Sequence, residues 1–217
     1  MLTRLPTDMQ NLGNLCHLHI DGTNIEEMPR GMGMLSHLQH LDVFIVGKHK
    51  ENGIKELGTL PNLHGSLSIR NLENVTRSNE ALEARMMNKN IIALSLQWYN
   101  GTDFQIELDV LCKLKPHQGL GSLSISGYNG SIFPDWVGNF SYHNMTYLRL
   151  HNCNNCCVLP SLGQLPSLKY LYISKLNSVK TVDAGFYKNE DCPSVTSFSS
   201  LETLYIDDVL LGVVEYP

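Results

Sequence analysis

The side chains in this chain that could carry chemistry are thiols and imidazoles. Cys153 and Cys156 form a C-x-x-C pair, the spacing of half a zinc site or of a redox pair. A zinc ribbon needs a second such pair, and none stands at the required spacing. Free cysteine is usually buried, and Cys153 follows Leu150 within a repeated phrase. We therefore expect Cys153 to be structural, bonding to the backbone of a turn.

The histidines offer a second possible site. His17, His19 and His40 are expected on one face of a sheet, with Asp21 and Asp42 as candidate further ligands on the same strands. The simpler expectation is that these histidines contact solvent or a partner, so no metal is predicted. No Ser/His/Asp or Cys/His arrangement and no paired carboxylates have independent support. The chain is not expected to be an enzyme.

The elements that would position these residues are set by a repeated phrase, L-x-x-L-x-L. One further copy, Leu63-Leu67-Ile69, carries an extra residue. The middle leucines are between 23 and 33 residues apart, and this period with this phrase is typical of leucine-rich repeats. The regular copies are Leu15-Leu18-Ile20, Leu38-Leu41-Val43, Ile91-Leu94-Leu96, Leu120-Leu123-Ile125, Met145-Leu148-Leu150, Leu168-Leu171-Ile173 and Leu201-Leu204-Ile206.

The phrase predicts an α/β solenoid of about eight repeats. The L-x-L part alternates with the period of a strand, and stacked repeats bury its leucines in one continuous core. Wider return segments bend the stack, so the parallel sheet should lie on the concave side. Short helices and irregular turns should lie on the convex side.

The return segments differ in their predicted structure. Residues 78–90 and 104–114 predict helices, the first with a possible Ser78 cap. Residues 71–75 and 159–163 indicate irregular turns, and residues 181–197 indicate a surface loop. The predicted apolar stripes are Leu82, Met86 and Met87 in the first helix, and Ile106, Leu108, Leu111, Cys112 and Leu114 in the second.

Residues 1–206 are expected to form one leucine-rich-repeat domain. Residues 2–12 look like the return half of a repeat whose strand is missing, so the first repeat is expected to be incomplete. Residues 207–217 form an atypical tail without a polar cap, and an uncapped solenoid end exposes core leucines. We expect a fragment, or a truncated product, of something longer.

Composition excludes several classes of function. The 217 residues carry a formal net charge of −5 and no basic stripe, so no nucleic-acid partner is expected. No apolar run approaches the roughly 20 residues of a membrane helix, so no membrane association is expected. The N-terminus has no signal-peptide h-region, and the six cysteines form no spaced framework. A cytoplasmic location is expected, with the nucleus as the alternative.

Strand alternation places the residues between the leucines on the concave face, which is where a protein partner is expected. Phe44 is expected there too. Tyrosine and arginine dominate interface hot spots, although the tyrosines could instead merely cover the sheet. The predicted protein-binding residues are Tyr147, Arg149, His151, Tyr170, Tyr172, Tyr205, His19, Asp42 and Arg70.

Several longer phrases resemble one family. They are L-T-R-L-P-x-x-M from Leu2, G-S-L-S-I-R-N-L-E-N-V from Gly65, N-I-I-A-L-S-L-Q-W from Asn90, and F-P-D-W-V-G from Phe133, followed by L-P-S-L-G-Q-L-P from Leu159. In this order, across residues 1–206, the chain resembles the leucine-rich-repeat region of plant disease-resistance proteins of the coiled-coil, nucleotide-binding (NBS-LRR) type.

The resemblance implies a protein-interaction module of an intracellular plant immune receptor. Such a module recognises a pathogen effector or a guarded host protein and holds a nucleotide-binding switch domain inactive. The G-x-x-x-x-G-K-[ST] loop and coiled-coil heptads are absent from this sequence. No cofactor is therefore expected in this chain, and ATP or ADP would bind only an absent domain of the same receptor.

Two other functions remain open at this stage. An extracellular receptor-like or polygalacturonase-inhibitor-like repeat protein would make the five N-x-[ST] sequons relevant, but the chain lacks capping cysteine pairs and the regular L-x-G-x-I-P phrase. A nonfunctional truncated gene product would be prone to aggregation through its open ends.

Overall fold

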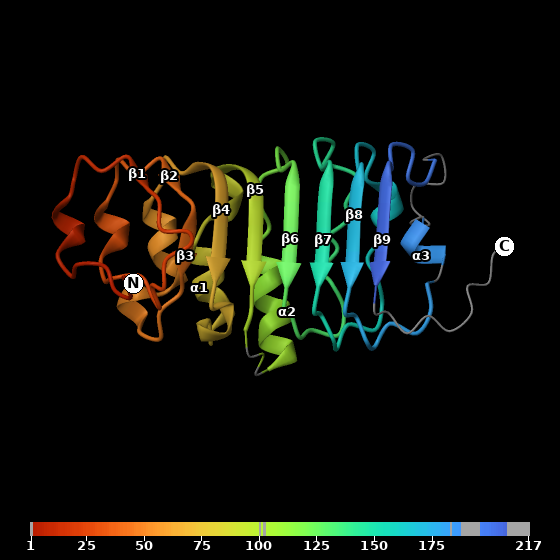
Figure 1. Cartoon of the computed structure of the whole chain (residues 1–217), viewed down its shortest axis with the longest axis horizontal. Coiled ribbons are helices and arrows are strands. Elements are labelled where there is room, and N and C mark those ends of the chain that lie inside the picture. The colour runs from red at the N-terminus through yellow and green to blue at the C-terminus, as the bar shows by residue number, and fades with distance from the viewer. Residues whose placement is uncertain (1, 100, 102, 183, 188–195, 208–217) are drawn as a thin grey trace.

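The computed structural model describes residues 2–99, 101, 103–182, 184–187 and 196–207. Its strands follow one another in chain order (Figure 1), and within each of two sheets every strand pairs in parallel with its neighbour. A two-stranded sheet holds the first pair, and a seven-stranded sheet holds the rest. The strands are β1 (His17–Leu18), β2 (His40–Leu41), β3 (Val43–Ile45), β4 (His64–Arg70), β5 (Asn90–Gln97), β6 (Ser122–Ser126), β7 (Tyr147–His151), β8 (Tyr170–Ser174) and β9 (Thr203–Asp207).

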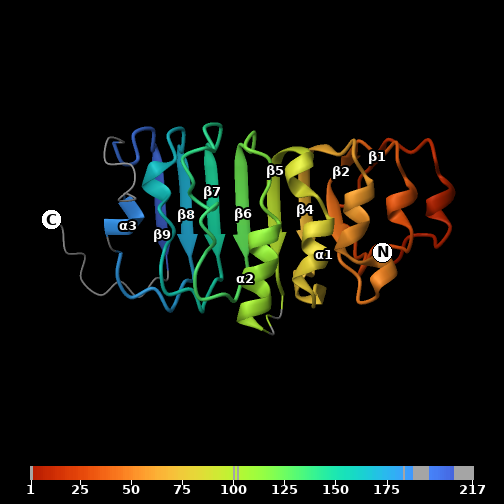
Figure 2. The same ribbon diagram turned by 180° about the vertical axis from the view of Figure 1, so that it is seen from behind.

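The return segments cover the opposite side of the sheet. In the view from behind (Figure 2), α1 (Ser78–Glu83) and α2 (Phe104–Lys113) lie in front of the strands. A third helix, α3, spans Ala184–Tyr187. Parallel strands need such crossover segments, because each strand must return to the same edge before the next begins. The other return segments form 3-10 helices at Met9–Asn11, Met32–Met34, Lys50–Asn52, Ile54–Thr59, Leu72–Asn74, Met86–Asn88 and Leu162–Gln164.

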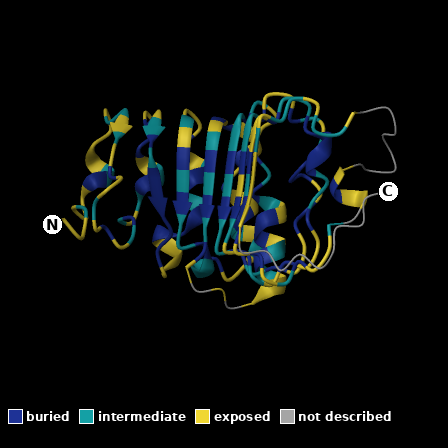
Figure 3. Ribbon diagram, turned by 45° about the vertical axis from the view of Figure 1, so that its right-hand side comes forward, coloured by how far each residue is buried: buried dark blue, intermediate teal, exposed yellow. Residues whose placement is uncertain are grey.

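The leucines of the interior copies of the repeated phrase form the core, as predicted, whereas Leu18 of the first copy is partly buried and Leu204 of the last copy is exposed. Leu67, Leu94 and Leu123 lie in register on neighbouring strands and are almost fully buried. Buried and more exposed residues alternate along the strands in Figure 3. Every copy of the phrase contains a strand, so the predicted α/β solenoid with a parallel sheet is confirmed.

One strand register differs from the prediction, at the break between β2 and β3. Val43 was expected in the core and Phe44 on the concave face. Val43 is buried, as expected, although it pairs in register with Ser68, whereas Phe44 pairs with the core residue Ile69 and is fully buried. The chain bends at Asp42, which adds one residue between the two strands and reverses the side chains that follow, because strand side chains alternate with a period of two.

The predicted helices are correct in position but differ in the face they bury. The first covers only Ser78–Glu83 and is followed by a 3-10 turn, with Ala81, Ala84 and Met86 buried. Leu82 and Met87, expected in the core, are 60% and 57% exposed. The left-handed conformation of Arg85, at φ 54°, ends the helix and changes the face that the next turn presents.

Two details of these helices also differ from the sequence prediction. Ser78 does not cap α1, because Arg77 holds the cap position, and the Ser78 hydroxyl instead accepts a hydrogen bond from Lys113 Nζ at 2.7 Å. In α2 the buried face includes Val110, Leu111 and Leu114, whereas Cys112 is exposed.

The C-terminal predictions fall partly outside the described residues. Within the segment 181–197, which was predicted as a surface loop, the chain forms α3, and Phe186 is buried against Phe198 with ring centroids 5.1 Å apart. Residues 183 and 188–195 lie outside the described part, as do Cys192 and the predicted tail from residue 208 onward.

Polar side chains connect successive repeats through backbone groups. Three glutamate carboxylates each accept a hydrogen bond from a backbone N–H in a turn of a neighbouring repeat. Each bond stabilises an N–H that has no partner in the sheet. The bonds are Gly33 N to Glu56 Oε2 at 2.8 Å, Tyr99 N to Glu73 Oε2 at 3.1 Å, and Asn129 N to Glu107 Oε2 at 2.7 Å.

Lys89 makes an unusual contact of this kind, because it is a buried cation. Its side chain is nearly inaccessible and Nζ donates to the carbonyl oxygen of Leu60 at 2.8 Å. Burial, with a smaller contribution from the charge of Arg85, lowers the pKa of Lys89 to about 8. Because burial disfavours the charged form, this lysine destabilises the fold while it is protonated.

We expect Lys89 to destabilise the fold less as pH rises, so that its contribution to the free energy of unfolding increases. Its pKa is about 8 in the folded chain and roughly 10.4 when unfolded, so between these values the unfolded chain binds more protons. The difference in unfolding free energy between the native chain and Lys89→Met should therefore rise by about 1–3 kcal/mol from pH 7 to pH 10. Urea unfolding followed by circular dichroism measures this.

The comparison with the variant is necessary because other buried groups act in the opposite direction. Burial raises the pKa of Cys153 and Cys156, so their contribution to stability is lost as pH rises above the pKa of an unfolded thiol. Both proteins share that loss. Lys50→Met removes an exposed lysine and is the matched control. A Lys89→Met difference that stays constant with pH would contradict the prediction.

Candidate protein-binding face

Strand register arranges the side chains on the outer surface of the sheet, called here the sheet face, in three rows. Residues paired across strands in register share a row, and alternate residues along a strand share a face. The middle row is Ser68, Ser95, Ser124, Arg149, Tyr172 and Tyr205; one flanking row is Ser66, Ala93, Ser122, Tyr147, Tyr170 and Thr203; the other is Arg70, Gln97, Ser126, His151, Ser174 and Asp207. Val43 and Ile45 continue two of these rows onto β3 but are buried.

Four tyrosines gather on β7, β8 and β9, and Tyr147, Tyr170, Tyr172 and Tyr205 are called here the tyrosine cluster. The ring centroids of Tyr147 and Tyr172 are 5.4 Å apart, and those of Tyr172 and Tyr205 are 6.0 Å apart. These distances are typical of favourable aromatic pairs. Tyr205 is 48% exposed and Tyr170 is 38% exposed. The cluster therefore presents a large aromatic surface to solvent.

Polar neighbours fix the edge of the tyrosine cluster. The hydroxyl of Tyr170 donates to Glu202 Oε2 at 3.2 Å, and Glu202 Oε1 pairs with Lys169 Nζ at 2.7 Å. The hydrogen bond and charge of Lys169 hold the pKa of Glu202 below its usual range. The negative charge of Asp207 raises the pKa of Tyr205. A hydrogen bond between the two side chains acts in the same direction, so the Tyr205 hydroxyl is held toward Asp207.

Arg149 and His151 lie beside the tyrosine cluster on β7. Arg149 is exposed, lies between Ser124 and Tyr172 in the middle row, and forms no ion pair with any described residue. The Nδ1 atom of His151 is 2.9 Å from Ser174 Oγ. Partial burial, then the charges of Arg149 and Lys175, lower the pKa of His151. The structure thus brings six of the predicted residues together: Tyr147, Arg149, His151, Tyr170, Tyr172 and Tyr205.

The other three predicted residues lie near β1 to β4 and are held by their own chain. Arg70 NH2 pairs with Asp21 Oδ1 at 2.7 Å, an interaction that lowers the pKa of Asp21. Asp42 accepts the backbone N–H of Ile20 at 3.0 Å, replacing a ladder bond where β2 breaks, and lies 3.4 Å from His19 Nδ1. Three strand spacings, about 14 Å, separate Arg70 on β4 from Arg149 on β7. The structure does not bring these three to the tyrosine cluster.

A shallow hollow of about 290 Å³ lies between the two groups, over β4, β5 and β6. Its floor is made of small side chains, among them Ser66, Ser95, Ser122 and Ser124. It is called here the serine hollow. Strand alternation places the small hydroxyl side chains of these middle strands on the sheet face, but it does not show that they form a hollow. The sequence does carry a signal for the hollow, because β4, β5 and β6 each have Ser or Ala at two face positions in succession: Ser66 and Ser68, Ala93 and Ser95, and Ser122 and Ser124.

Three imidazoles lie in contact across the first strands, with His17 stacked on His40 and His64 edge-on to His40. The ring centroids of His17 and His40 are 4.8 Å apart, and those of His40 and His64 are 4.3 Å apart. Partial burial, followed by the neighbouring imidazoles, lowers the pKa of His40. His64 could not be placed in this row from the sequence, because the extra residue of its repeat moves it out of the regular phrase. Across the described residues, no three His, Cys, Asp or Glu side chains are placed to hold a metal ion.

The C-x-x-C cysteines are buried in the core. Cys153 Sγ lies 3.5 Å from the carbonyl oxygen of His151 and Cys156 Sγ lies 3.2 Å from that of Val158. Burial raises the pKa of Cys153 and raises that of Cys156 to about 12. Thiols that stay protonated are poor nucleophiles and metal ligands. The structural position predicted for Cys153 is therefore confirmed.

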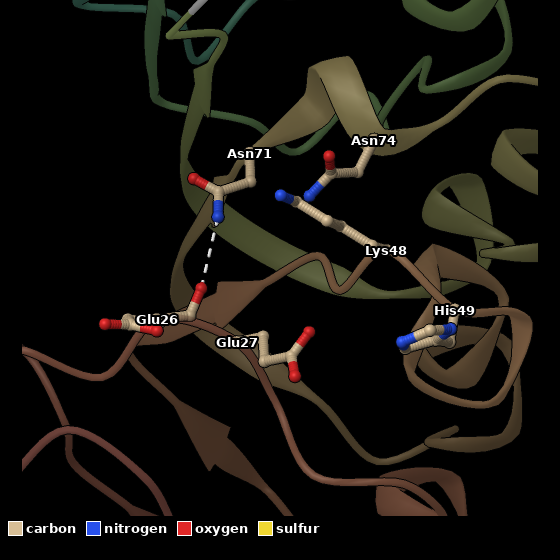
Figure 4. Close-up of a pocket in the computed structure, with 6 residues that line it drawn as sticks. All are labelled: Glu26, Glu27, Lys48, His49, Asn71 and Asn74. Atoms are coloured by element: carbon tan, nitrogen blue, oxygen red, sulfur yellow. Dashed lines mark hydrogen bonds between the residues drawn. The ribbon is translucent and has the colours of Figure 1, made fainter.

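A second hollow, of about 360 Å³, lies among the turns that follow β3 and β4 (Figure 4). Asn71 Nδ2 donates to the carbonyl oxygen of Glu26 at 3.2 Å, and Asn74 Nδ2 donates to that of Val46 at 2.8 Å. Glu27 and Lys48 complete its lining together with Glu26 and His49. Both amides thus bond to the backbone of neighbouring turns, and we assign this hollow no ligand.

Comparison with known proteins identifies the family. The pattern described as R13L1/DRL21 leucine-rich repeats matches residues 54–176, more than half of the chain. The chain belongs to this family. A protein of Arabidopsis thaliana named for disease resistance is 37% identical over 77% of the chain and 12% of its own length. Disease resistance protein RGA2 of Solanum bulbocastanum is 36% identical over 81% of the chain and 19% of its own length.

The R13L1/DRL21 repeats also have a structural relative. A solved leucine-rich-repeat protein of Leptospira interrogans matches 97% of this chain and 47% of that chain, with a TM-score of 0.52 and 16% identity. At that identity the likeness shows the fold alone. The resemblance to the leucine-rich-repeat region of plant disease-resistance proteins is thus confirmed.

This region spans less than one fifth of the length of these curated relatives. Among its described helices, none is long and apolar enough to cross a membrane.

Proposed function

We propose that this R13L1/DRL21 repeat region is the recognition module of an intracellular plant immune receptor. Its ligand would be a protein, either a pathogen effector or a host protein that the receptor guards. The observation that supports the proposal is the exposed tyrosine cluster with Arg149 beside it, because Tyr and Arg bury large area while keeping a hydrogen-bonding end. The role is binding, without catalysis and without a cofactor in this chain.

We further propose that this region holds a nucleotide-binding domain of the same receptor inactive. The relatives named for disease resistance are several times longer than the chain, which leaves room in them for a switch domain beside the matched region. A ligand that binds better to the released arrangement would shift a two-state equilibrium toward activation. The receptor would act in the cytoplasm or the nucleus, and ATP or ADP would bind the switch domain only.

Replacing Tyr172 and Arg149 together with alanine is expected to abolish binding of the protein ligand. Tyr172 is the central ring of the tyrosine cluster and Arg149 is its adjacent cation. Losing two hot-spot residues of these types weakens complexes by about 4 kcal/mol or more, roughly a thousandfold. Biolayer interferometry against a panel of secreted pathogen proteins measures the change for every protein that binds the native chain.

The melting temperature of the double variant should stay close to that of the native chain, because Arg149 is exposed and Tyr172 is only partly buried. Tyr99→Ala with Arg77→Ala is the matched control, since both residues are exposed and lie off the tyrosine cluster. If a ligand binds the Tyr172→Ala/Arg149→Ala chain as well as the native chain, the tyrosine cluster is not the binding surface.

A further inference from the structure

We propose that the protein ligand inserts an acidic side chain into the serine hollow and that this carboxylate binds Arg149. The inference rests on the proposed function, because it names the chemistry of the partner at the same face. It assigns the partner a protruding loop with an Asp or Glu at its tip, flanked by apolar residues that pack on the tyrosine cluster.

The first observation is a step in height across the sheet face. On β4, β5 and β6 the middle row carries only Ser68, Ser95 and Ser124, and the hollow lies over them. On β7 the side chains become large, with Tyr147 and Arg149 directly beside Ser122 and Ser124. A protruding loop fits against such a step, because the small side chains leave room for it and the large ones contact its flank.

The second observation is the state of the cations on this face. Arg70 pairs with Asp21 at 2.7 Å, and Lys169 pairs with Glu202 at 2.7 Å. Arg149 is the register neighbour of Ser124, which lines the hollow, and it has no carboxylate partner among the described residues. A guanidinium offers donors in a fixed fork that matches a carboxylate, and the resulting charge-assisted bonds are about twice as strong as neutral ones.

The third observation is the charge at the two ends of the hollow, which fixes where the carboxylate goes. Asp21 and Asp42 line the end near β1 and β2, and one of these two negative charges is balanced there by Arg70. The excess negative charge repels an acidic side chain at that end. This acidic end, where Arg70 lies, is roughly 14 Å from Arg149, which is more than the screening length of about 8 Å at physiological ionic strength. Its repulsion of an acidic side chain is therefore weak beside Arg149. An acid is therefore favoured at the β6–β7 end.

The hydroxyls near Arg149 complete the site. Ser124 is the register neighbour of Arg149, and Ser95 is the register neighbour of Ser124. Each serine hydroxyl can donate one hydrogen bond to a carboxylate oxygen. A carboxylate between Arg149 and these serines would therefore receive donors from two strands, which offsets part of the cost of removing it from water.

The test uses a library of thioether-closed macrocyclic peptides with seven random positions, selected on the immobilised 217-residue chain. Peptides whose binding is lost on Tyr172→Ala are the sheet-face binders. We expect Asp or Glu to be enriched at one central position among them. Their affinity should fall about tenfold or more on Arg149→Gln and by less than about threefold on Arg149→Lys.

Exchanging the charges of the two partners gives a more decisive test. A selected peptide in which the central acid is changed to Lys should bind Arg149→Glu better than it binds the native chain, because the ion pair is restored with reversed signs. Lys50→Gln, which removes an exposed cation on a return segment, should leave every peptide affinity unchanged.

Two results would overturn the inference, and only the second would also count against the proposed function. If sheet-face binders lack an enriched acid, or bind Arg149→Gln as tightly as the native chain, the acidic contact is wrong and the proposed function stands. If no selected peptide responds to Tyr172→Ala, the tyrosine cluster does not bind protein segments, and the acidic contact and the proposed use of this face both fail.

Discussion

Leu148→Ala is expected to lower the free energy of unfolding by about 2–5 kcal/mol, whereas Leu204→Ala should lower it by less than about 1 kcal/mol. Both leucines occupy the middle position of the repeated phrase, and both pair with Leu171 in register. Leu148 is fully buried and Leu204 is 51% exposed. The same substitution at the same repeat position therefore measures what the next repeat contributes by covering the leucine.

The physical reason lies in how a solenoid stabilises each repeat. A leucine in the middle of the stack packs between the repeats on both sides, so its removal leaves a cavity that the surrounding structure fills only in part. Leu204 lies on β9, the last strand of the sheet, and has a described repeat on one side only. Its removal leaves no closed cavity.

Urea unfolding followed by circular dichroism gives both values, with the slope of free energy against urea checked in each variant, because repeat arrays can lose two-state behaviour. Leu171→Ala, also fully buried, serves as a second interior reference. Equal losses for Leu148→Ala and Leu204→Ala would show that the last repeat is covered as well as the interior ones in solution.

The sequence predicts the sheet well and the return segments less well, for a local reason. Strand positions follow from alternation over three to five residues, and stacking of identical phrases enforces them. A single inserted residue is enough to mislead: the bend at Asp42 moves Phe44 from the sheet face into the core. Helix faces depend on where each helix ends, and the left-handed Arg85 that ends α1 carries no strong sequence signal.

The sheet face could be predicted as a set of positions, but its pairings could not. Tyr147, Tyr172 and Tyr205 follow directly from alternation, and the structure places their rings side by side. The ion pair between Asp21 and Arg70 joins residues 49 positions apart, the first in the turn that follows β1 and the second on β4, two strands that do not pair. Only side-chain length and rotamer decide such a contact, so the sequence indicated Arg70 as available where the structure has it paired.

Gly127→Ala is expected to lower the free energy of unfolding by about 2–5 kcal/mol, of which about 1–2 kcal/mol is the cost of a left-handed backbone in a residue with a side chain. Gly127 follows β6 with φ 71°, and a Cβ there would overlap the carbonyl oxygen of Trp98 on the neighbouring repeat. Gly22, with φ 74° and nothing within 4 Å of a Cβ, isolates the backbone cost alone. Gly22→Ala should cost about 1–2 kcal/mol in the same urea titration.

The other strand ends show why the overlap, and not the backbone angle, requires glycine at position 127. Asn71, Asn152 and Lys175 hold the corresponding left-handed position after β4, β7 and β8, so the angle itself tolerates a side chain. Asparagine adopts this conformation readily, so Gly22→Asn should be close to neutral. Gly127→Asn keeps the overlap with the Trp98 carbonyl and should still cost about 2 kcal/mol or more. If Gly127→Asn were instead as mild as Gly22→Asn, the backbone angle would be the whole cost, and the close approach of the two repeats at Trp98 would relax without penalty.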